Sequence, residues 1–303
     1  MSHARSAIIV ADGGIDLPEG YAERFGILMV PLMLRFGDQE YKSGVDITPA
    51  EFYSRLRNGG GKEWPSTSQP PVGDFLAVYR EAAASGLPIL SFHISAGLSG
   101  SYGSARLAKE MLPTADIRLV DTGTLSGAMA LQVLVAANMA RDGADPDAII
   151  AETKRIGAVS EIFYTIDTLE YLRRGGRIGR VAGFVGSLLG IRPIITVDKS
   201  LGTYVGAGRG RSFRQAANSI VESIVDRVGE GNEITCLILH GDVVADAERM
   251  IANLRSKLKV HWVEAIRANP SLGAHVGPDT LGIAYYPGKL PAELGLATEL
   301  VGD

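Results

Sequence analysis

The feature that most constrains the fold is an alternation of short, mostly apolar runs with helical segments in the first half of the chain. The run AIIV at residues 7–10 ends at Asp12, and similar runs occupy residues 89–94 and 117–120. The segments between them carry apolar residues at helical spacing. A run that is apolar on both faces is typical of a strand buried in a parallel sheet. The pattern therefore predicts an N-terminal β/α domain with a parallel sheet.

The pattern changes near Ser160. Further strands are expected at IFYTI, PIITV and ITCLILH and near residues 281–286, with helices between them. A chain of 303 residues is long enough for two domains. We therefore expect an α/β protein with an N-terminal β/α domain at residues 1–160 and a C-terminal α/β domain at residues 161–303.

Local signals give expectations for three shorter segments. Residues 26–45 suggest two strands around a turn at Gly37-Asp38. Thr48 is expected to cap a helix that begins at Pro49. Asp167 is expected to cap a short helix that ends at Gly175-Gly176.

Composition argues against several classes of partner. The formal charge is -4 and the basic residues are scattered, so no nucleic-acid partner is expected. The N-terminus does not resemble a signal peptide, and the longest apolar stretch, residues 128–140, is shorter than the roughly 18 residues that a membrane span needs. That stretch predicts a buried helix. Cys236 is the single cysteine, which excludes an intramolecular disulfide, and we expect a cytoplasmic protein without stable membrane insertion.

The stretch WPSTSQPPVGDF, residues 64–75, predicts a stiff loop before a helix that begins near Pro71. Prolines on both sides restrict their neighbours to extended conformations, so the hydroxyls of Thr67 and Ser68 have little residual freedom. Such a loop can donate hydrogen bonds to a ligand. The alternative is that these hydroxyls only cap the next helix.

A second polar loop, SAGLSGS, precedes another helical pattern. Ser99 lies just before that helix, so the N–H groups of Gly100 and Ser101 are expected to be free and to attract an anion. Glycines in the loop would let a ligand oxygen approach the backbone. Ser95 is a second candidate for the same contact. This pattern favours a binding role over capping alone.

Two further groups are candidates for ligand or partner recognition. His275 is expected in a loop between glycines, where a neutral imidazole could donate to an oxyanion or accept from a hydroxyl. Arg174 and Arg177 flank the glycine pair at 175 and 176 and suit phosphate or carboxylate recognition. The alternatives are a surface histidine and a solvated basic face.

No catalytic centre is predicted. The segment around Ser99 misses the nucleophile-elbow pattern by one residue, and no glycine loop of the Walker type occurs. Asp12 and Asp16 could hold a cation, but two carboxylates at the end of a strand more often form turn and cap hydrogen bonds. We therefore expect no metal and no cofactor.

Taken together, the ordered motifs resemble the DegV family of bacterial fatty-acid-binding proteins. The segments that carry the resemblance run in family order across nearly the whole chain: Asp12 to Asp16, STSQPPVGDF, ISAGLSGSYGSA, VDTGTLSG, TLEYLRRGGRIG, LLGIRPIITV and GAHVGPDTLG. The sequence departs from the family pattern at Gly13, Ala96, Pro71 and Asp279.

The resemblance implies one long-chain fatty acid held between the two domains, with hydroxyls bonding its carboxylate. It places Thr67 and Ser99, or Ser95, at the carboxylate, with His275 near the head group and Arg177 at the arginine of the GGR motif. Some family members present the acid to a separate ATP-dependent fatty acid kinase subunit. The resemblance thus implies a carrier with a fatty acid as ligand.

Two other functions stay open at the sequence level. One is a small-molecule phosphotransferase related to dihydroxyacetone-type kinases, with His275 as a covalent or acid-base residue. The other is a lipid-free interaction module that docks a partner through its arginines. Physical reasoning favours the carrier, because the stretch GRVAGFVGSLLG offers small and branched apolar residues for one wall of a lipid tunnel.

Overall fold

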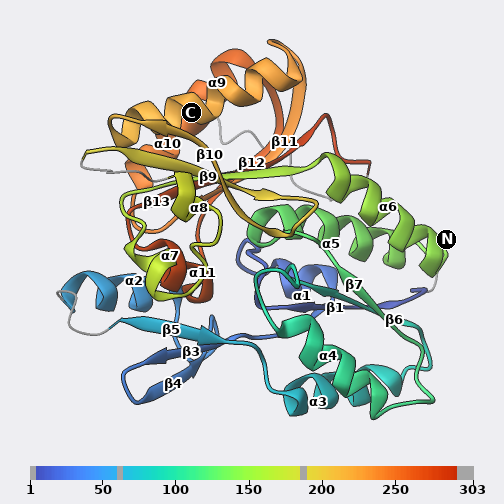
Figure 1. Ribbon diagram of the computed structural model, residues 1–303. Helices are drawn as coiled ribbons and strands as arrows, with labels where there is room; N and C mark the ends of the chain where they lie inside the picture. The colour runs from blue at the N-terminus through green and yellow to red at the C-terminus, as the bar shows by residue number, and fades with distance from the viewer. Residues whose placement is uncertain (1–4, 60–63, 185–189, 292–303) are drawn as a thin grey trace.

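The computed structural model describes residues 5–59, 64–184 and 190–291, and it has the predicted two-domain α/β architecture (Figure 1). The N-terminal part contains a parallel sheet in the order β2-β1-β6-β7. Its strands are β1 Ile8–Asp12, β2 Ile27–Val30, β6 Ile89–His93 and β7 Ile117–Asp121. β6 is buried at every position, because helices cover both faces of the sheet. The predicted parallel sheet is confirmed.

Helices pack on both faces of this sheet. They are α1 Tyr21–Phe25, α3 Val72–Ala83, α4 Ser101–Glu110 and α5 Ser126–Arg141. α6 Pro146–Val159 packs on α5. α3 and α4 lie on one face, while α5 lies on the other, between the N-terminal and C-terminal sheets (Figure 1). α5 is buried at nearly every position, as the apolar stretch 128–140 predicts. Within the described part of the chain, no helix combines the length and apolar character needed to cross a bilayer.

The C-terminal part contains a mixed sheet in the order β10-β9-β8-β13-β11-β12. Its strands are β8 Glu161–Ile166, β9 Arg192–Asp198, β10 Thr203–Gly210, β11 Glu233–His240, β12 Lys259–Arg267 and β13 Thr280–Pro287. Helices α9 Phe213–Val228 and α10 Val244–Lys257 pack on one face. The sequence did not predict β12, because this edge strand has few buried positions and no clear apolar run.

A small antiparallel sheet, β4-β3-β5, extends from the N-terminal part. It consists of β3 Met33–Phe36, β4 Gln39–Lys42 and β5 Pro65–Ser68, and it packs against α2 Pro49–Asn58. Two expectations were wrong here. Residues 26–45 form three strands and not two, and the supposed loop at Thr67 is the edge strand β5. The predicted cap of α2 by Thr48 is confirmed, and Glu51 completes a capping box with it.

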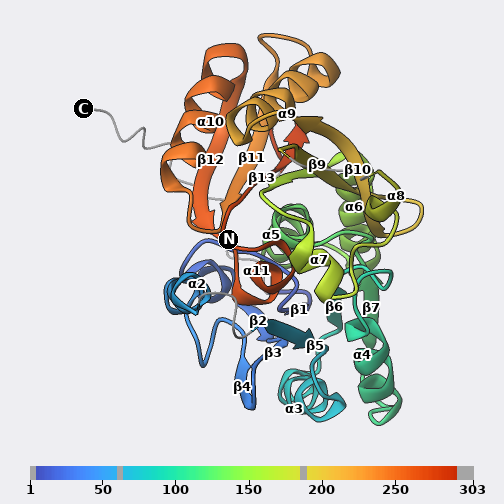
Figure 2. The same ribbon diagram turned by 60° about the vertical axis from the view of Figure 1, so that its left-hand side comes forward.

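Two short helices, α7 Glu170–Arg174 and α11 Pro270–Val276, lie between the small sheet and the C-terminal sheet (Figure 2). A third, α8 Val181–Phe184, lies beside β10. His275 lies in α11, so its assignment to a loop was wrong. Asp167 does not cap α7. Thr168 accepts the N–H of Glu170 in that role, and Asp167 pairs with Arg192.

The glycines at 175 and 176 do end α7, as predicted. Of the helical face expected to form a tunnel wall, Val181 is buried in the main core. Val185, Leu188 and Leu189 lie outside the described residues.

Candidate functional site

A narrow cavity lies where the carboxyl ends of the parallel strands meet β5, β10 and α11. This edge of a parallel sheet is where α/β proteins commonly bind ligands. The cavity is small, with a volume of about 30 Å³. Its wall is mostly apolar with several polar groups. The lining residues are Gly14, Leu32, Thr67, Ser68, Ile94, Leu98, Ser99, Leu125, Arg177, Tyr204, Ser271, Leu272 and His275.

The central polar contact joins the two halves of the chain. The hydroxyl of Thr67 on β5 lies 2.7 Å from Nε2 of His275 on α11. The antiparallel pairing of β5 with β3 fixes Thr67 opposite Leu34, and a buried turn of α11 fixes His275. Two residues 208 positions apart therefore share one hydrogen bond at the cavity wall.

His275 is neutral near pH 7. Its side chain is almost wholly buried, and burial, with a smaller contribution from the nearby Arg177 charge, lowers its pKa from 6.5 to about 4. A neutral imidazole has one N–H and one lone pair, so Nε2 can either donate to Thr67 or accept from it. If Nε2 donates, the Thr67 hydroxyl proton is available to a ligand oxygen.

The glycine pair Gly175-Gly176 lies where α7 ends next to the His275 ring. A Cβ on Gly175 would overlap Nδ1 of His275, so α7 can approach the imidazole only with glycine there. Gly176 follows with a φ of 70°, in the left-handed region that favours glycine. The Gly175-Gly176 pair thus ends α7 and makes room for His275.

Gly175→Ala should destabilise the fold by about 2 kcal/mol, because the added methyl group forces α7 and α11 apart. The φ of Gly175 is -73°, so the effect comes from packing and not from backbone strain. Urea unfolding monitored by circular dichroism measures it. Gly103→Ala in α4 is the matched control, because its Cβ meets open space and should leave stability unchanged or slightly higher. Equal stabilities for the two variants would contradict this account.

The two arginines of the basic cluster have different positions. Arg177 lines the cavity, and its guanidinium donates to the carbonyls of Gly175 at 2.6 Å and Leu98 at 3.4 Å. Arg174 is outside the cavity wall; it bonds Glu170 and lies over the ring of Trp64 at 4.1 Å. Arg177 therefore places positive charge at the cavity, and Arg174 at the surface beside it.

The structure separates the candidates of the SAGLSGS loop. Ser99 and Ser68 line the cavity. Ser95 does not: its buried hydroxyl donates to the carbonyl of Gly202 at 2.7 Å. Gly100 is also absent from the wall. The expectation of free N–H groups was wrong for Ser101, whose N–H donates to the Ser99 hydroxyl.

The expectation that the glycines of this loop let a ligand oxygen approach the backbone was wrong. A Cβ on Gly97 would lie 2.6 Å from the carbonyl oxygen of Leu201, and one on Gly100 would meet the side chain of Gln69. Gly103 faces open space. The close approach at Gly97 and Gly100 is therefore made by other segments of this chain and not by a ligand.

Buried carboxylates anchor the elements that carry the site. Asp16 accepts the N–H of Asn269 at 2.6 Å and the hydroxyl of Ser126 at 2.5 Å. The Asn269 side chain caps α11 and also donates to the carbonyls of Gly13 and Ile15. This network fixes α11, and with it His275, to the loop after β1.

Asp12 has a similar role in the sheet. It accepts the hydroxyl of Ser101 at 2.5 Å and the backbone N–H groups of Gly14 and Ile94. The preference for turn and cap bonding by Asp12 and Asp16 is confirmed. In the regions that the structure describes, no group of three or more His, Cys, Asp or Glu side chains could hold a metal ion.

Several wall residues were not predicted from the sequence. Tyr204 comes from β10, and Ser271 and Leu272 come from the first turn of α11. Asn269-Pro270 is a helix-start signal. This signal predicts a helix that contains both Ser271 and His275. Tyr204 has no such local signal.

The fold and the site define a two-domain α/β protein with a narrow, mostly apolar ligand cavity that bears polar groups. Comparison with known proteins identifies its family. Residues 6–288 match the model of the family described as "Uncharacterised protein, DegV family". A DegV domain-containing protein of Deinococcus radiodurans is 37% identical over 294 residues, which cover 97% of this chain and 100% of that protein. The chain belongs to the DegV family.

Solved structures agree with this assignment. A DegV family protein from Thermus thermophilus, known for fatty acid binding, superposes with a TM-score of 0.84 at 32% identity, covering 93% of this chain and 99% of that one. DegV of Bacillus subtilis, a fatty acid binding protein, gives a TM-score of 0.83 at 26% identity, covering 93% and 99%. The predicted family and fold class are confirmed.

Proposed function

We propose that this protein binds one long-chain fatty acid in the cavity between its domains and carries it without transforming it. The observation that carries the proposal is the Thr67–His275 pair on a mostly apolar wall, in a family whose solved relatives from Thermus thermophilus and Bacillus subtilis bind fatty acids. We place the division between the two domains at residues 160 and 161.

In this proposal the carboxylate contacts the hydroxyls of Thr67, Ser68 and Ser99. Neutral His275 orients the Thr67 hydroxyl through Nε2, while the fixed charge of Arg177 attracts the anion to this end of the cavity. Ser95 and Gly100 are not included, because neither lines the wall.

The acyl chain is proposed to run along the apolar part of the wall, past Leu98, Leu125 and Leu272. These side chains would move apart to admit it, because the cavity of about 30 Å³ is much smaller than the tail. Burying a tail of about 16 carbons at ~0.8 kcal/mol per CH₂ offers on the order of ten kcal/mol before association costs. A few polar contacts can then orient the head group, while the tail supplies most of the affinity.

We further propose that a separate ATP-dependent kinase subunit receives the acid from this carrier for acyl-phosphate formation. Arg174 supports a docking role, because its guanidinium lies at the surface next to the site. The Thr67 hydroxyl lies against the His275 imidazole, but Nδ1 of His275 has no hydrogen-bond partner among the described residues, so the third group that orients the base in an acyl-transfer site is missing. The lowered pKa of His275 also makes this imidazole a weak base.

Denaturing mass spectrometry of an organic extract from freshly purified protein tests the proposal. We expect about one fatty acid per chain, because a buried tail dissociates slowly. Protein without lipid that also fails to bind added fatty acid would contradict it. Turnover of ATP or of a phosphorylated metabolite by this chain alone would instead support the phosphotransferase alternative.

A further inference from the structure

Two ion pairs of one arginine join the N-terminal and C-terminal parts of the chain beside α11. Arg57, in the last turn of α2, donates through Nε to the Asp242 carboxylate at 2.8 Å and through a terminal nitrogen to the Asp279 carboxylate at 2.7 Å. Arg267, at the end of β12, donates to the second oxygen of Asp242 at 3.0 Å. We call the pairs of Arg57 with Asp242 and Asp279 the Arg57 fork.

The two carboxylates of the fork are bound to the C-terminal end of α11. The backbone N–H of Asp242 donates to the carbonyl of Pro278 at 2.8 Å, and Asp279 is the next residue along the chain. The hydroxyl of Thr280 donates to the carbonyl of Val276, the last residue of α11, at 2.8 Å. The position of the two aspartates is therefore coupled to the end of this helix.

The helix that carries Arg57 is coupled to the strand that carries Thr67. α2 packs against the small sheet and also contacts α11, and Figure 2 shows α2 and α11 next to each other. Phe52 of α2 belongs to a buried cluster with Leu34 of β3 and Ala274 of α11. Leu34 in turn is paired with Thr67 of β5. α2 therefore connects α11 with the sheet on which Thr67 lies.

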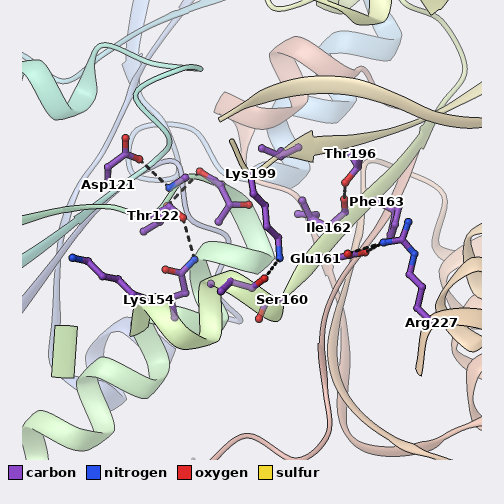
Figure 3. Close-up of a pocket in the computed structure, with 16 residues that line it drawn as sticks. Asp121, Thr122, Lys154, Ser160, Glu161, Ile162, Phe163, Thr196, Lys199 and Arg227 are labelled. Atoms are coloured by element: carbon purple, nitrogen blue, oxygen red, sulfur yellow. Dashed lines mark hydrogen bonds and ion pairs between the residues drawn. The ribbon is translucent and has the colours of Figure 1, made fainter. Parts of the chain in front are cut away.

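The opposite side of the boundary between the two parts has a different character. Figure 1 shows α2 and α6 on opposite sides of the molecule. On the α6 side lies a groove of about 510 Å³, which is also lined by the loop after β7 and by β8, β9 and α9 (Figure 3). Lys199 bonds the carbonyl of Ala158 there, but the ion pair of the groove, Glu161–Arg227, lies within the C-terminal part. None of the described residues that line the groove forms an ion pair across the boundary.

The Arg57 fork is part of a network and is not an isolated surface pair. A single exposed ion pair contributes little to stability, but here Arg57 serves two carboxylates and Asp242 serves two arginines. Burial by itself would raise the pKa of Asp242, and the two arginines lower this pKa instead. The side chains of Arg57 and Asp242 are 38% and 31% exposed, so salt should weaken the network without abolishing it.

We propose that Arg57 is a positioning residue for the head-group site. Through its two carboxylate partners it holds α11 against the small sheet, and so keeps Nε2 of His275 within reach of the Thr67 hydroxyl. This inference rests on the proposed fatty-acid binding. The cavity of about 30 Å³ must widen before a tail can enter or leave, and widening moves the elements of its wall apart. A fork that opposes this movement should slow the release of a bound fatty acid.

NMR of delipidated protein with isotope-labelled histidine tests the positioning without any ligand. The Nε2 resonance of His275, assigned with the variant His275→Gln, reports the hydrogen bond to Thr67. Arg57→Met should move this resonance toward its position in Thr67→Val. Arg57→Lys keeps the charge and should recover part of the wild-type value. The ring of His93, buried in β6, should be unaffected in both variants of Arg57, whereas a general loss of structure would change both rings.

The second measurement is the release of a bound fluorescent fatty acid, cis-parinaric acid, to an excess of phosphatidylcholine vesicles. Arg57→Met should release it about fivefold faster than the wild type does. Asp279→Asn removes one arm of the fork and should give a smaller increase. Raising the salt concentration from about 50 mM to about 500 mM should speed release from the wild type more than from Arg57→Met, because salt screens exposed charges.

Arg118→Met is the matched control, because Arg118 also pairs with two carboxylates, those of Asp116 and Asp147, but within the N-terminal part. Its release rate should equal that of the wild type. Circular dichroism melting curves confirm that each variant is folded.

An unchanged His275 resonance in Arg57→Met, or a release rate equal to that of the wild type, would overturn the positioning role and leave fatty-acid binding intact. Equally fast release from Arg118→Met would also overturn it, because the effect would then be one of general electrostatics. A wild type that does not bind the probe would contradict the proposed function itself. The His275 resonance of the delipidated protein would then still decide whether Arg57 positions the imidazole.

Discussion

The double variant Thr67→Val/Ser99→Ala should lose its fatty acid while remaining folded. Each hydroxyl is proposed to donate to the carboxylate, and a hydrogen bond to a charged group contributes about 1.5–3 kcal/mol. Loss of both corresponds to a decrease in affinity of about 100-fold or more. The measurements are the lipid content of purified protein by mass spectrometry and the dissociation constant for added fatty acid.

Stability and a neighbouring residue provide the controls for this prediction. Thr67→Val leaves Nε2 of His275 without a partner, so the free energy of unfolding should fall by about 1–2 kcal/mol without loss of the fold. Ser66→Ala is the matched control, because Ser66 is on the same strand, is exposed and does not line the cavity. Full lipid occupancy in the double variant would reject the proposed head-group contacts.

Much of the fold could be predicted because its signals are local. The apolar runs around Ile9, Leu90 and Leu119 predict strands by composition alone, and Thr48-Pro49 predicts a helix start by capping chemistry. Where the local pattern was weak, as in the edge strand β12, the prediction missed the element. Local sequence also could not show that residues 65–68 pair with β3, since that pairing depends on segments about 30 residues apart.

The types of residue at the site could be predicted from the sequence, but the contacts between residues distant in the sequence could not. The hydroxyls of Thr67 and Ser99 stand out as polar groups between constrained backbone segments, and the structure brings both to one wall with His275. The contact of Thr67 with His275 spans 208 residues, and no local pattern encodes it. No local pattern shows either that the Ser95 hydroxyl donates to the carbonyl of Gly202, which lies on a turn distant in the sequence.

Two buried titratable groups near the site, His275 and Asp16, should have opposing effects on stability as pH changes. Burial lowers the pKa of His275 to about 4, so the unfolded chain binds the proton more tightly and stability falls as pH decreases from about 6.5 to 4. Burial raises the pKa of Asp16 to about 6. The folded chain then binds the proton more tightly, and stability rises as pH decreases from about 6 to 4. Each effect amounts to about 3 kcal/mol.

Single variants should therefore reveal slopes that largely cancel in the wild type. Asp16→Asn should lose about 3 kcal/mol of stability, relative to wild type, between pH 7 and pH 4, because the His275 effect is then unopposed. His275→Gln should show the opposite trend, and the double variant should return to a slope near that of the wild type. Urea unfolding from pH 7 to pH 4 measures all four proteins. Parallel stability curves for the four would mean that neither group titrates differently in the folded chain, and that the imidazole beside Thr67 is not held neutral by its surroundings.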